Sequence, residues 1–212
     1  YPHFAESTIT TSVEQAKAVI KKHQLPVKLN VVSPFYQQDD YISALVESAQ
    51  SYLTEPFDHL VFSYHGLPES HITKLDTSGG HCLKNGECCQ VANPAHNTCY
   101  RHQIMMTTER FVEKAGLSET QYSVAFQSRL GRAKWLDPNT EDRLKELAAA
   151  GAKNILVICP AFVTDCLETL EEIAIRGQEV FEEAGGEKLT LIPCLNQHPK
   201  WVETLAAWCV NK

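Results

Sequence analysis

Apolar residues recur along this chain in alternating helical and strand patterns. Spacings of three and four residues predict helices, and short β-branched runs bounded by turn residues predict strands. The expected helices cover residues 8–24, 39–53, 98–115, 141–150, 165–184 and 199–210. The expected strands cover residues 27–32, 60–64, 122–126, 154–159 and 189–193. This alternation predicts an α/β fold, a three-layer Rossmann-like domain with a central parallel sheet.

Composition narrows the class of protein further. The chain is 43% hydrophobic and carries a net charge of -7. An acidic chain without a basic patch is not expected to bind nucleic acid. No apolar run approaches the roughly 18 residues that a membrane span needs. The chain starts at Tyr1 and enters a helical pattern almost at once, so we expect it to be a piece of a longer protein.

Polar residues follow several of the expected strands. His65 and Gly66 come after the strand at 60–64, and Gln127, Ser128 and Arg129 come after the strand at 122–126. Ligands bind beyond the carboxyl ends of parallel strands, so we expect a site at this edge. No glycine-rich phosphate loop is present, which argues against a nucleotide-binding enzyme.

An acidic stripe marks the helix expected at 165–184. Asp165, Glu168, Glu172 and Arg176 follow one another at spacings of three, four and four. Like charges at these spacings repel, and an oxygen-rich stripe facing a cleft suits a divalent metal ion. Two plainer interpretations stay open. Asp165 and Glu168 also have capping-box spacing, and His65 alone can be a histidine at the edge of the core.

Eight cysteines form two groups. Cys159, Cys166, Cys194 and Cys209 lie at scattered apolar positions and are expected to be free thiols. The other four lie within eighteen residues, in the segment 67–97 that shows no periodicity and at its end: Cys82, Cys88, Cys89 and Cys99. Long loops of this kind are usually functional, and such crowding favours a metal or cluster over disulfides.

Three long motifs, in order, resemble those of ferrochelatases. They are the run 63–68 (SYHGLP), the run 126–138 from FQSRLG to WLDP, and the run 159–172 (CPAFVTDCLETLEE). The opening YPHF and the late PCLN at 193–196 match as well. The resemblance covers nearly the whole chain except the segment 69–98.

This resemblance implies two Rossmann-like domains of the chelatase-like fold with a porphyrin cleft between them. Residues 1–197 would form the second domain, with 69–98 as a cysteine-rich insertion. Residues 198–212 would form a helix that packs on the first domain, which this chain lacks. The implied activity is insertion of Fe2+ into protoporphyrin IX or coproporphyrin to form haem. The implied location is the cytoplasm, with brief contact at the inner membrane surface, and the sequence indicates no oligomeric state.

The family motifs also carry residue roles. The histidine and glutamate that face each other across the cleft correspond to His65 and Glu168, as catalytic residues and metal ligands. Whether His65 acts as ligand or as proton acceptor stays open. The metal path corresponds to Glu172 and Asp165. The porphyrin pocket would be lined by Tyr64, Gln127, Ser128, Arg129 and Trp135.

The spacing of the clustered cysteines, Cys82-x5-Cys88-Cys89-x9-Cys99, is not that of a zinc ribbon. Four thiolates match the ligand count of a [2Fe–2S] centre, and some bacterial ferrochelatases carry an internal four-cysteine insertion of this type. A [2Fe–2S] cluster is therefore expected, with structural zinc, free thiols or disulfides as alternatives. His81, His96 and His102 are nearby substitute ligands.

Two rival functions remain. One is a chelatase of the same fold that places cobalt or nickel into a reduced tetrapyrrole. The other is a non-catalytic iron–sulfur or metal-binding module, which would explain the cysteines but not the motifs. Porphyrin binding separates a chelatase from a pure cluster module.

Overall fold

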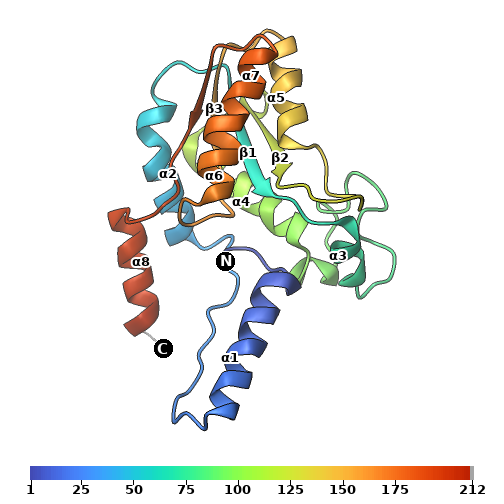
Figure 1. The fold of residues 1–212 in the computed structure, drawn as a ribbon, viewed down its shortest axis with the longest axis vertical. Helices are drawn as coiled ribbons and strands as arrows, with labels where there is room; N and C mark the ends of the chain where they lie inside the picture. The colour runs from blue at the N-terminus through green and yellow to red at the C-terminus, as the bar shows by residue number, and fades with distance from the viewer. Residues whose placement is uncertain (211–212) are drawn as a thin grey trace.

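A four-stranded parallel sheet forms the centre of the computed structural model, which describes residues 1–210 (Figure 1). The strands are β1 (His59–His65), β2 (Tyr122–Gln127), β3 (Asn154–Ile158) and β4 (Lys188–Leu191), in the order β2-β1-β3-β4. All three neighbouring pairs are parallel. Because β1 lies between β2 and β3, the residues that follow it are placed at the middle of the sheet edge.

One face of the sheet is covered by α2 (Asp39–Leu53), α4 (Tyr100–Ala115) and α8 (Pro199–Val210). Leu60, Phe62 and Tyr64 of β1 point to this face and are fully buried. The aromatic ring of Trp201 on α8 packs against Phe35 and Tyr41. These contacts bury large apolar side chains, each of which contributes about 1.5–3 kcal/mol when fully removed from water.

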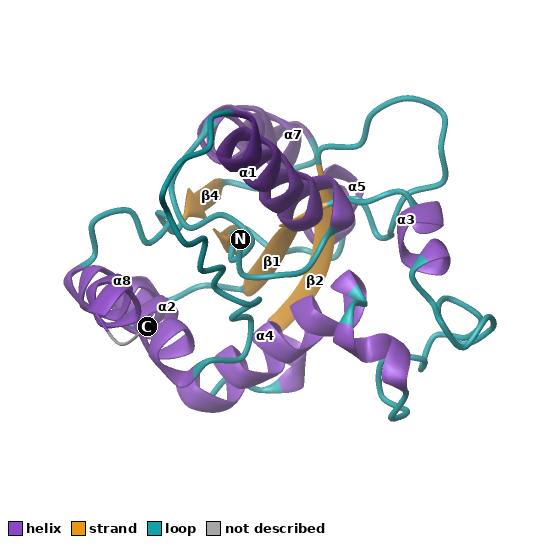
Figure 2. Cartoon of the chain, turned by 90° about the horizontal axis from the view of Figure 1, so that it is seen from below, coloured by secondary structure: helices purple, strands orange, loops and turns teal. Residues whose placement is uncertain are grey.

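The opposite face is covered by α5 (Thr140–Ala149) and by a long helix in three parts. The parts are α6 (Leu167–Thr169), the π-helical turn η4 (Leu170–Gly177) and α7 (Gln178–Glu183). Val61 of β1 and Val157 of β3 pack here with Leu144, Ile173 and Phe181. Figure 2 shows the two groups of helices on opposite sides of the strands, so the predicted three-layer architecture is confirmed.

The segment before α2 follows the sequence prediction for the helix expected at 8–24 and departs from it for the strand expected next. A π-helical turn, η1 (Glu6–Thr10), leads into α1 (Thr11–Lys22), and neither contains a buried residue. The strand predicted at 27–32 is wrong, because these residues are irregular and no described strand pairs with them. Val27, Leu29 and Val31 are 58%, 39% and 45% exposed. The alternating pattern is present, but nothing within residues 1–210 covers its apolar side, and Figure 1 shows α1 projecting away from the sheet.

The cysteine-rich segment is mostly irregular, as predicted. It contains two short elements that its composition did not reveal, α3 (Glu69–Lys74) and the 3-10 helix η2 (Pro94–Asn97). Another 3-10 turn, η3 (Glu119–Gln121), leads into β2. Among the helices of residues 1–210, none is long and apolar enough to cross a membrane.

A buried histidine makes the stability of this fold depend on pH. His59, at the start of β1, is 8% exposed, and its Nε2 lies 2.9 Å from the hydroxyl of Ser123. Burial, together with the smaller effect of the nearby Arg143 guanidinium, lowers the pKa of His59 to about 4. Between pH 6.5 and 4 the unfolded chain therefore binds more protons at this position than the folded chain, so stability falls as the pH is lowered.

We expect His59→Asn to flatten the pH dependence of the free energy of unfolding between pH 6.5 and 4, by at most about 3 kcal/mol. Urea unfolding at several pH values measures this effect. His71→Asn, at an exposed position on α3, is the control and should follow the wild-type curve. Parallel curves for His59→Asn and the wild type would show that His59 does not cause the effect.

Candidate active site

His65 ends β1 at the carboxyl edge of the sheet and is half-buried. Its Nδ1 lies 2.6 Å from the carbonyl oxygen of Gly66. Since a carbonyl only accepts hydrogen bonds, Nδ1 must carry the proton, and Nε2 keeps its lone pair in the neutral ring. The backbone is fixed as well, because the hydroxyl of Tyr100 donates to the His65 carbonyl at 2.8 Å. The residue thus presents an oriented nitrogen that can bind a metal ion or accept a proton.

Glu168 lies in the first turn of α6 and is half-buried. A hydrogen bond from the Cys166 thiol and another from its own backbone N–H lower the pKa of its carboxyl group below the usual range. The nearby His65 acts in the same direction. The backbone is anchored by the side-chain amide of Gln127, which donates to the Glu168 carbonyl at 2.5 Å. Glu168 therefore stays negatively charged at neutral pH.

His65 and Glu168 line the same cavity, of about 540 Å³. Much of its wall is aromatic or aliphatic, including Tyr1, Leu67, Tyr100, Phe162 and Val163. The N-terminal segment contributes one side of the cavity, through Tyr1, Pro2, His3, Ala5, Ser7 and Thr8. The cavity combines a largely apolar wall with the imidazole of His65 and one carboxylate, which is the composition of a site for an organic ligand and a cation.

Asp165, predicted on the metal path or as a cap, is held by protein groups. Its Oδ2 accepts from the side-chain amide of Asn196 at 2.6 Å, and its Oδ1 accepts from the backbone N–H of Cys194 at 3.1 Å. Its Oδ1 also accepts from the Thr169 hydroxyl at 3.3 Å. Burial raises the pKa of Asp165, but these hydrogen bonds outweigh it and lower the pKa. The carboxylate joins the start of α6 to the segment after β4.

Glu172, on the π-helical turn η4, also has a protein partner for each oxygen. The backbone N–H of Ser128 donates to Oε1 at 2.6 Å, and the Ser128 hydroxyl donates to Oε2 at 2.8 Å. Ser128 has a φ of 66°, a left-handed conformation that is unfavourable for a side chain other than glycine. Glu172 thus stabilises an unusual backbone turn after β2.

The residues expected to line a porphyrin pocket do not line the 540 Å³ cavity. Tyr64 is fully buried and its hydroxyl bonds that of Thr108. Gln127 is 1% exposed. Arg129 is on the surface, paired with Asp137 at 2.9 Å. The sequence missed the N-terminal segment, Tyr100 and Phe162, although Phe162 lies within the motif 159–172.

Trp135 packs over Gly66, next to His65. A Cβ atom on Gly66 would lie 2.8 Å from the carbonyl oxygen of Gln127 and 3.2 Å from Cε3 of Trp135. The Trp135 indole N–H donates to the Leu130 carbonyl at 3.0 Å, which fixes the ring. Only glycine allows this close approach of β1, β2 and the following loop.

The four clustered cysteines lie together at the start of α4. Cys82, Cys88 and Cys99 are buried and Cys89 is half-buried, and all eight cysteines of the chain are free thiols. The thiols of Cys89 and Cys82 lie near Cys99, and that of Cys89 has the largest effect in lowering the pKa of Cys99. The backbone N–H of Leu83 lies 3.4 Å from the sulfur of Cys88.

The predicted substitute ligands near these thiols bond to backbone instead. His81 and His96 contact the carbonyl oxygen of Cys88 through Nε2 at 2.6 and 2.9 Å. His102 contacts that of Cys89 through Nδ1 at 3.0 Å. Across residues 1–210, no group of three or more His, Cys, Asp or Glu side chains is arranged to hold a metal ion.

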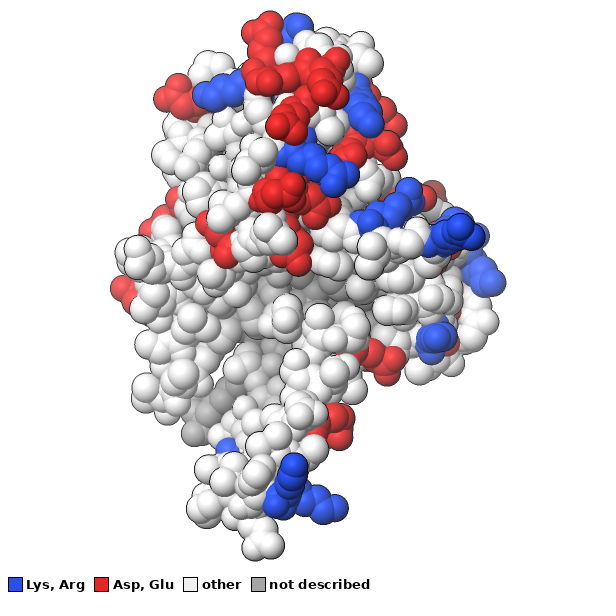
Figure 3. All heavy atoms as spheres, in the orientation of Figure 1, with Lys and Arg blue, Asp and Glu red and all other residues white. Residues whose placement is uncertain are grey.

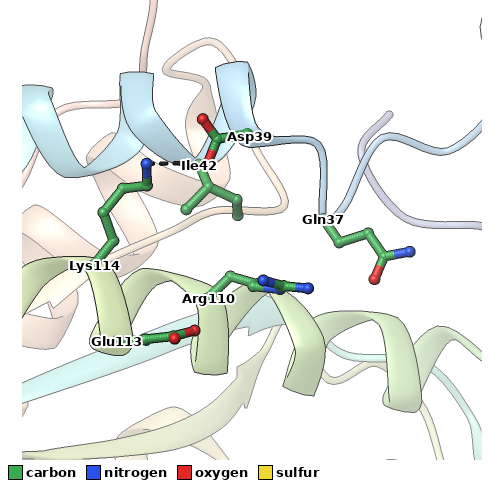
Figure 4. A pocket seen from close by; sticks show the side chains of 6 residues that line it. All are labelled: Gln37, Asp39, Ile42, Arg110, Glu113 and Lys114. Atoms are coloured by element: carbon green, nitrogen blue, oxygen red, sulfur yellow. Dashed lines mark ion pairs between the residues drawn. The ribbon is translucent and has the colours of Figure 1, made fainter.

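A second cavity, of about 460 Å³, lies between α2 and α4 (Figure 4). It is lined by Gln37, Asp39, Ile42, Arg110, Glu113 and Lys114. Lys114 and Asp39 form an ion pair of 3.0 Å there. Its charges lie in exposed side chains, and none of the candidate site residues contributes to it.

Acidic side chains gather over the long helix (Figure 3). Those of α6, η4 and α7 are Glu168, Glu171, Glu172, Glu179, Glu182 and Glu183. A negative surface beside the cavity favours the approach of cations over anions.

The parallel sheet lies between two layers of helices, and an imidazole and a carboxylate share one cavity at its carboxyl edge. This arrangement defines an α/β protein of the chelatase-like class. A sequence model described as ferrochelatase matches residues 1–212. The chain therefore belongs to the ferrochelatase family.

Curated relatives agree with this family. The ferrochelatase of Ectopseudomonas mendocina (strain ymp) is 58% identical over 99% of the chain. Those of Pseudomonas fluorescens (strain Pf0-1) and Stutzerimonas stutzeri (strain A1501) are each 56% identical over 99% of the chain. In all three comparisons the chain spans 62% of the relative's length.

Proposed function

We propose that this chain forms the metal-binding part of a ferrochelatase, which inserts Fe2+ into a porphyrin to give haem. One observation carries the proposal: His65 and Glu168, from the ends of two separate elements, line one largely apolar cavity. Porphyrin metallation exchanges two pyrrole N–H protons for one metal ion. The cavity offers a group that can accept protons, a ligand for Fe2+ and a wall suited to a flat macrocycle. Protoporphyrin IX and coproporphyrin both satisfy this chemistry.

The roles of the two residues follow from their hydrogen bonds. The Nδ1 proton of His65 is held by a carbonyl, which leaves Nε2 to bind the entering Fe2+ or to take a pyrrole proton. Glu168 supplies a hard oxygen ligand and a negative charge, and Fe2+ accepts both ligand types.

We propose that Asp165 and Glu172 assist His65 and Glu168. All of their carboxylate oxygens receive hydrogen bonds from Asn196, Cys194, Thr169 or Ser128. A role in relaying Fe2+ therefore requires them to exchange those bonds for metal contacts. Ser128 and Arg129 are proposed to meet the porphyrin from the turn that Glu172 holds. Tyr64, Gln127 and Trp135 would support the pocket from within the fold.

The cysteine cluster is proposed to hold a [2Fe–2S] centre. The donor set fits, because four unbridged thiols lie near enough to influence one another's pKa values. A two-iron centre distributes its four thiolates over two metal ions, so its ligands need not converge on a single point. We assign the cluster to Cys82, Cys88, Cys89 and Cys99, with structural zinc as the alternative occupant.

The chain is proposed to form the second of two domains. Residues 1–197 would make up this domain, with 69–98 as the insertion, and the helix from residue 198 would pack on the rest of the protein. Residues 211–212 lie outside the described structure. Exposed apolar side chains support this arrangement. They are Val27, Leu29 and Val31 in the irregular segment after α1, and Val202, Leu205 and Val210 on α8. We propose a cytoplasmic location with peripheral contact at the membrane surface.

A porphyrin titration tests the proposal. We expect protoporphyrin to show a shift of its Soret band on adding the chain, and Phe162→Ala to weaken binding by about tenfold through loss of the cavity wall. Phe57→Ala, which changes a half-buried ring away from the cavity, should bind like the wild type. A chain that contains iron and sulfide but leaves the Soret band unchanged would instead support a non-catalytic iron–sulfur module.

A further inference from the structure

A guanidinium group faces the adjacent cysteines Cys88 and Cys89. Arg101 lies in the first turn of α4, and its Nη1 is 3.3 Å from the sulfur of Cys89 and 3.6 Å from that of Cys88. In the described part of the chain, no carboxylate lies within ion-pair distance of Arg101. The permanent charge of this half-buried side chain is therefore directed at two sulfur atoms.

The backbone carbonyls of the two cysteines also have side-chain partners. His81 and His96 contact the Cys88 carbonyl, and His102 contacts the Cys89 carbonyl. The rings of His96 and His102 are stacked, with centroids 3.8 Å apart. Three imidazoles thus fix the carbonyls while Arg101 fixes the sulfurs, so both thiols are presented together.

The start of α4 adds positive potential at the same place. Cys99 is the N-cap residue of this sixteen-residue helix, so it directly precedes the first turn, which contains Arg101. The N-terminal end of a helix carries partial positive charge, which stabilises nearby anions. Arg101 and the helix terminus therefore act on the same group of sulfurs.

We propose that Arg101 is a positioning residue that holds Cys88 and Cys89 as cluster ligands and favours the reduced form of the centre. This inference rests on the proposed [2Fe–2S] cluster. Four thiolates and two sulfides outweigh two ferric ions by two negative charges. One electron, supplied in the experiment by dithionite, converts one ferric ion to ferrous and raises the excess to three. A fixed cation beside two of the ligands stabilises the more negative form.

The test is a redox titration of the full chain with dithionite and mediators, followed by absorption. For Arg101→Gln we expect the reduction equilibrium to become about tenfold less favourable, a downward shift of about 59 mV for a one-electron couple. Arg101→Lys, which keeps the charge, should recover at least half of that shift. Arg110→Gln is the matched control, because Arg110 lies on the same helix but faces the cavity of Figure 4. It should keep the wild-type potential.

The cluster content, assayed as iron and sulfide, tests the presence of the cluster separately from the role of Arg101. A wild-type chain without iron and sulfide would remove the proposed cluster itself. A wild-type chain with the cluster, and an Arg101→Gln variant of unchanged potential and unchanged content, would overturn the role of Arg101 alone. Loss of the cluster from Arg101→Gln but not from Arg101→Lys would support that role. Loss from both would overturn it, because the charge is retained in the lysine variant.

Discussion

Replacing His65 with alanine is expected to lower the rate of iron insertion by about 100-fold or more, with porphyrin binding retained. A positioned acid or base typically contributes a factor of 100 to 10,000, and His65 is the only histidine besides the buried His3 that lines the cavity in the described residues. The Nε2 of His3 lies 2.9 Å from the Thr107 hydroxyl, and burial lowers the pKa of His3 to about 3. His3 therefore cannot replace the proton acceptor or ligand that the variant loses.

Haem formation is measured with a longer protein, made by fusing this chain to the part of a relative that the chain does not cover. Absorption assays of haem formation at several porphyrin concentrations separate kcat from KM. The loss of activity should appear in kcat. His71→Ala, at an exposed position on α3, is the control and should keep the full rate. Full activity of the His65→Ala enzyme would exclude both roles of His65, as ligand and as base.

The same assay with Glu168→Gln measures what the negative charge of Glu168 contributes. Glu168→Gln keeps the size of the side chain and one oxygen acceptor but removes the carboxylate. If the charge holds the entering Fe2+, the variant needs a higher iron concentration for half-maximal rate.

The sequence predicted the strands of the sheet and the helices that cover it, and it also predicted α1, which buries no residue. The parallel strands β1 to β4 and the helices α2, α4, α5 and α8 were all predicted within a few residues of their observed bounds. The pattern at 27–32 failed for a physical reason. Alternation shows which side chains would be buried together, but it does not show whether a neighbouring strand exists to bury them.

The candidate site was predictable in part for a similar reason. The rule that ligands bind at the carboxyl edge of parallel strands led to His65, and the helical stripe led to Glu168. Spacing along a helix could not reveal that Asp165 and Glu172 bond to Asn196 and Ser128, which are 31 and 44 residues away. It also could not place the N-terminal segment in the cavity wall. Those contacts arise from tertiary packing, for which local patterns carry no signal.

Cys99→Ser is expected to abolish cluster binding, the largest effect foreseen for the cysteine-rich segment. Cys99 is buried at the N-cap of α4, and the nearby Cys82 and Cys89 thiols both lower the pKa of its thiol. A hydroxyl is a far poorer ligand for iron than a thiolate, and a centre left with three thiolates is expected to be lost during purification.

Iron, sulfide and zinc assays on protein purified without oxygen, together with the absorption spectrum, measure this effect. The wild type should hold about two iron and two sulfide per chain, and Cys99→Ser should hold almost none. Cys209→Ser, at an exposed cysteine on α8, should match the wild type and controls for the loss of a thiol as such. A colourless wild type with about one zinc would identify the segment as a structural zinc site, in which four thiolates close around one ion. In that case Cys99→Ser would release zinc and loosen the start of α4, where the Tyr100 hydroxyl donates to the carbonyl oxygen of His65, while the side-chain hydrogen bonds of His65 and Glu168 would remain.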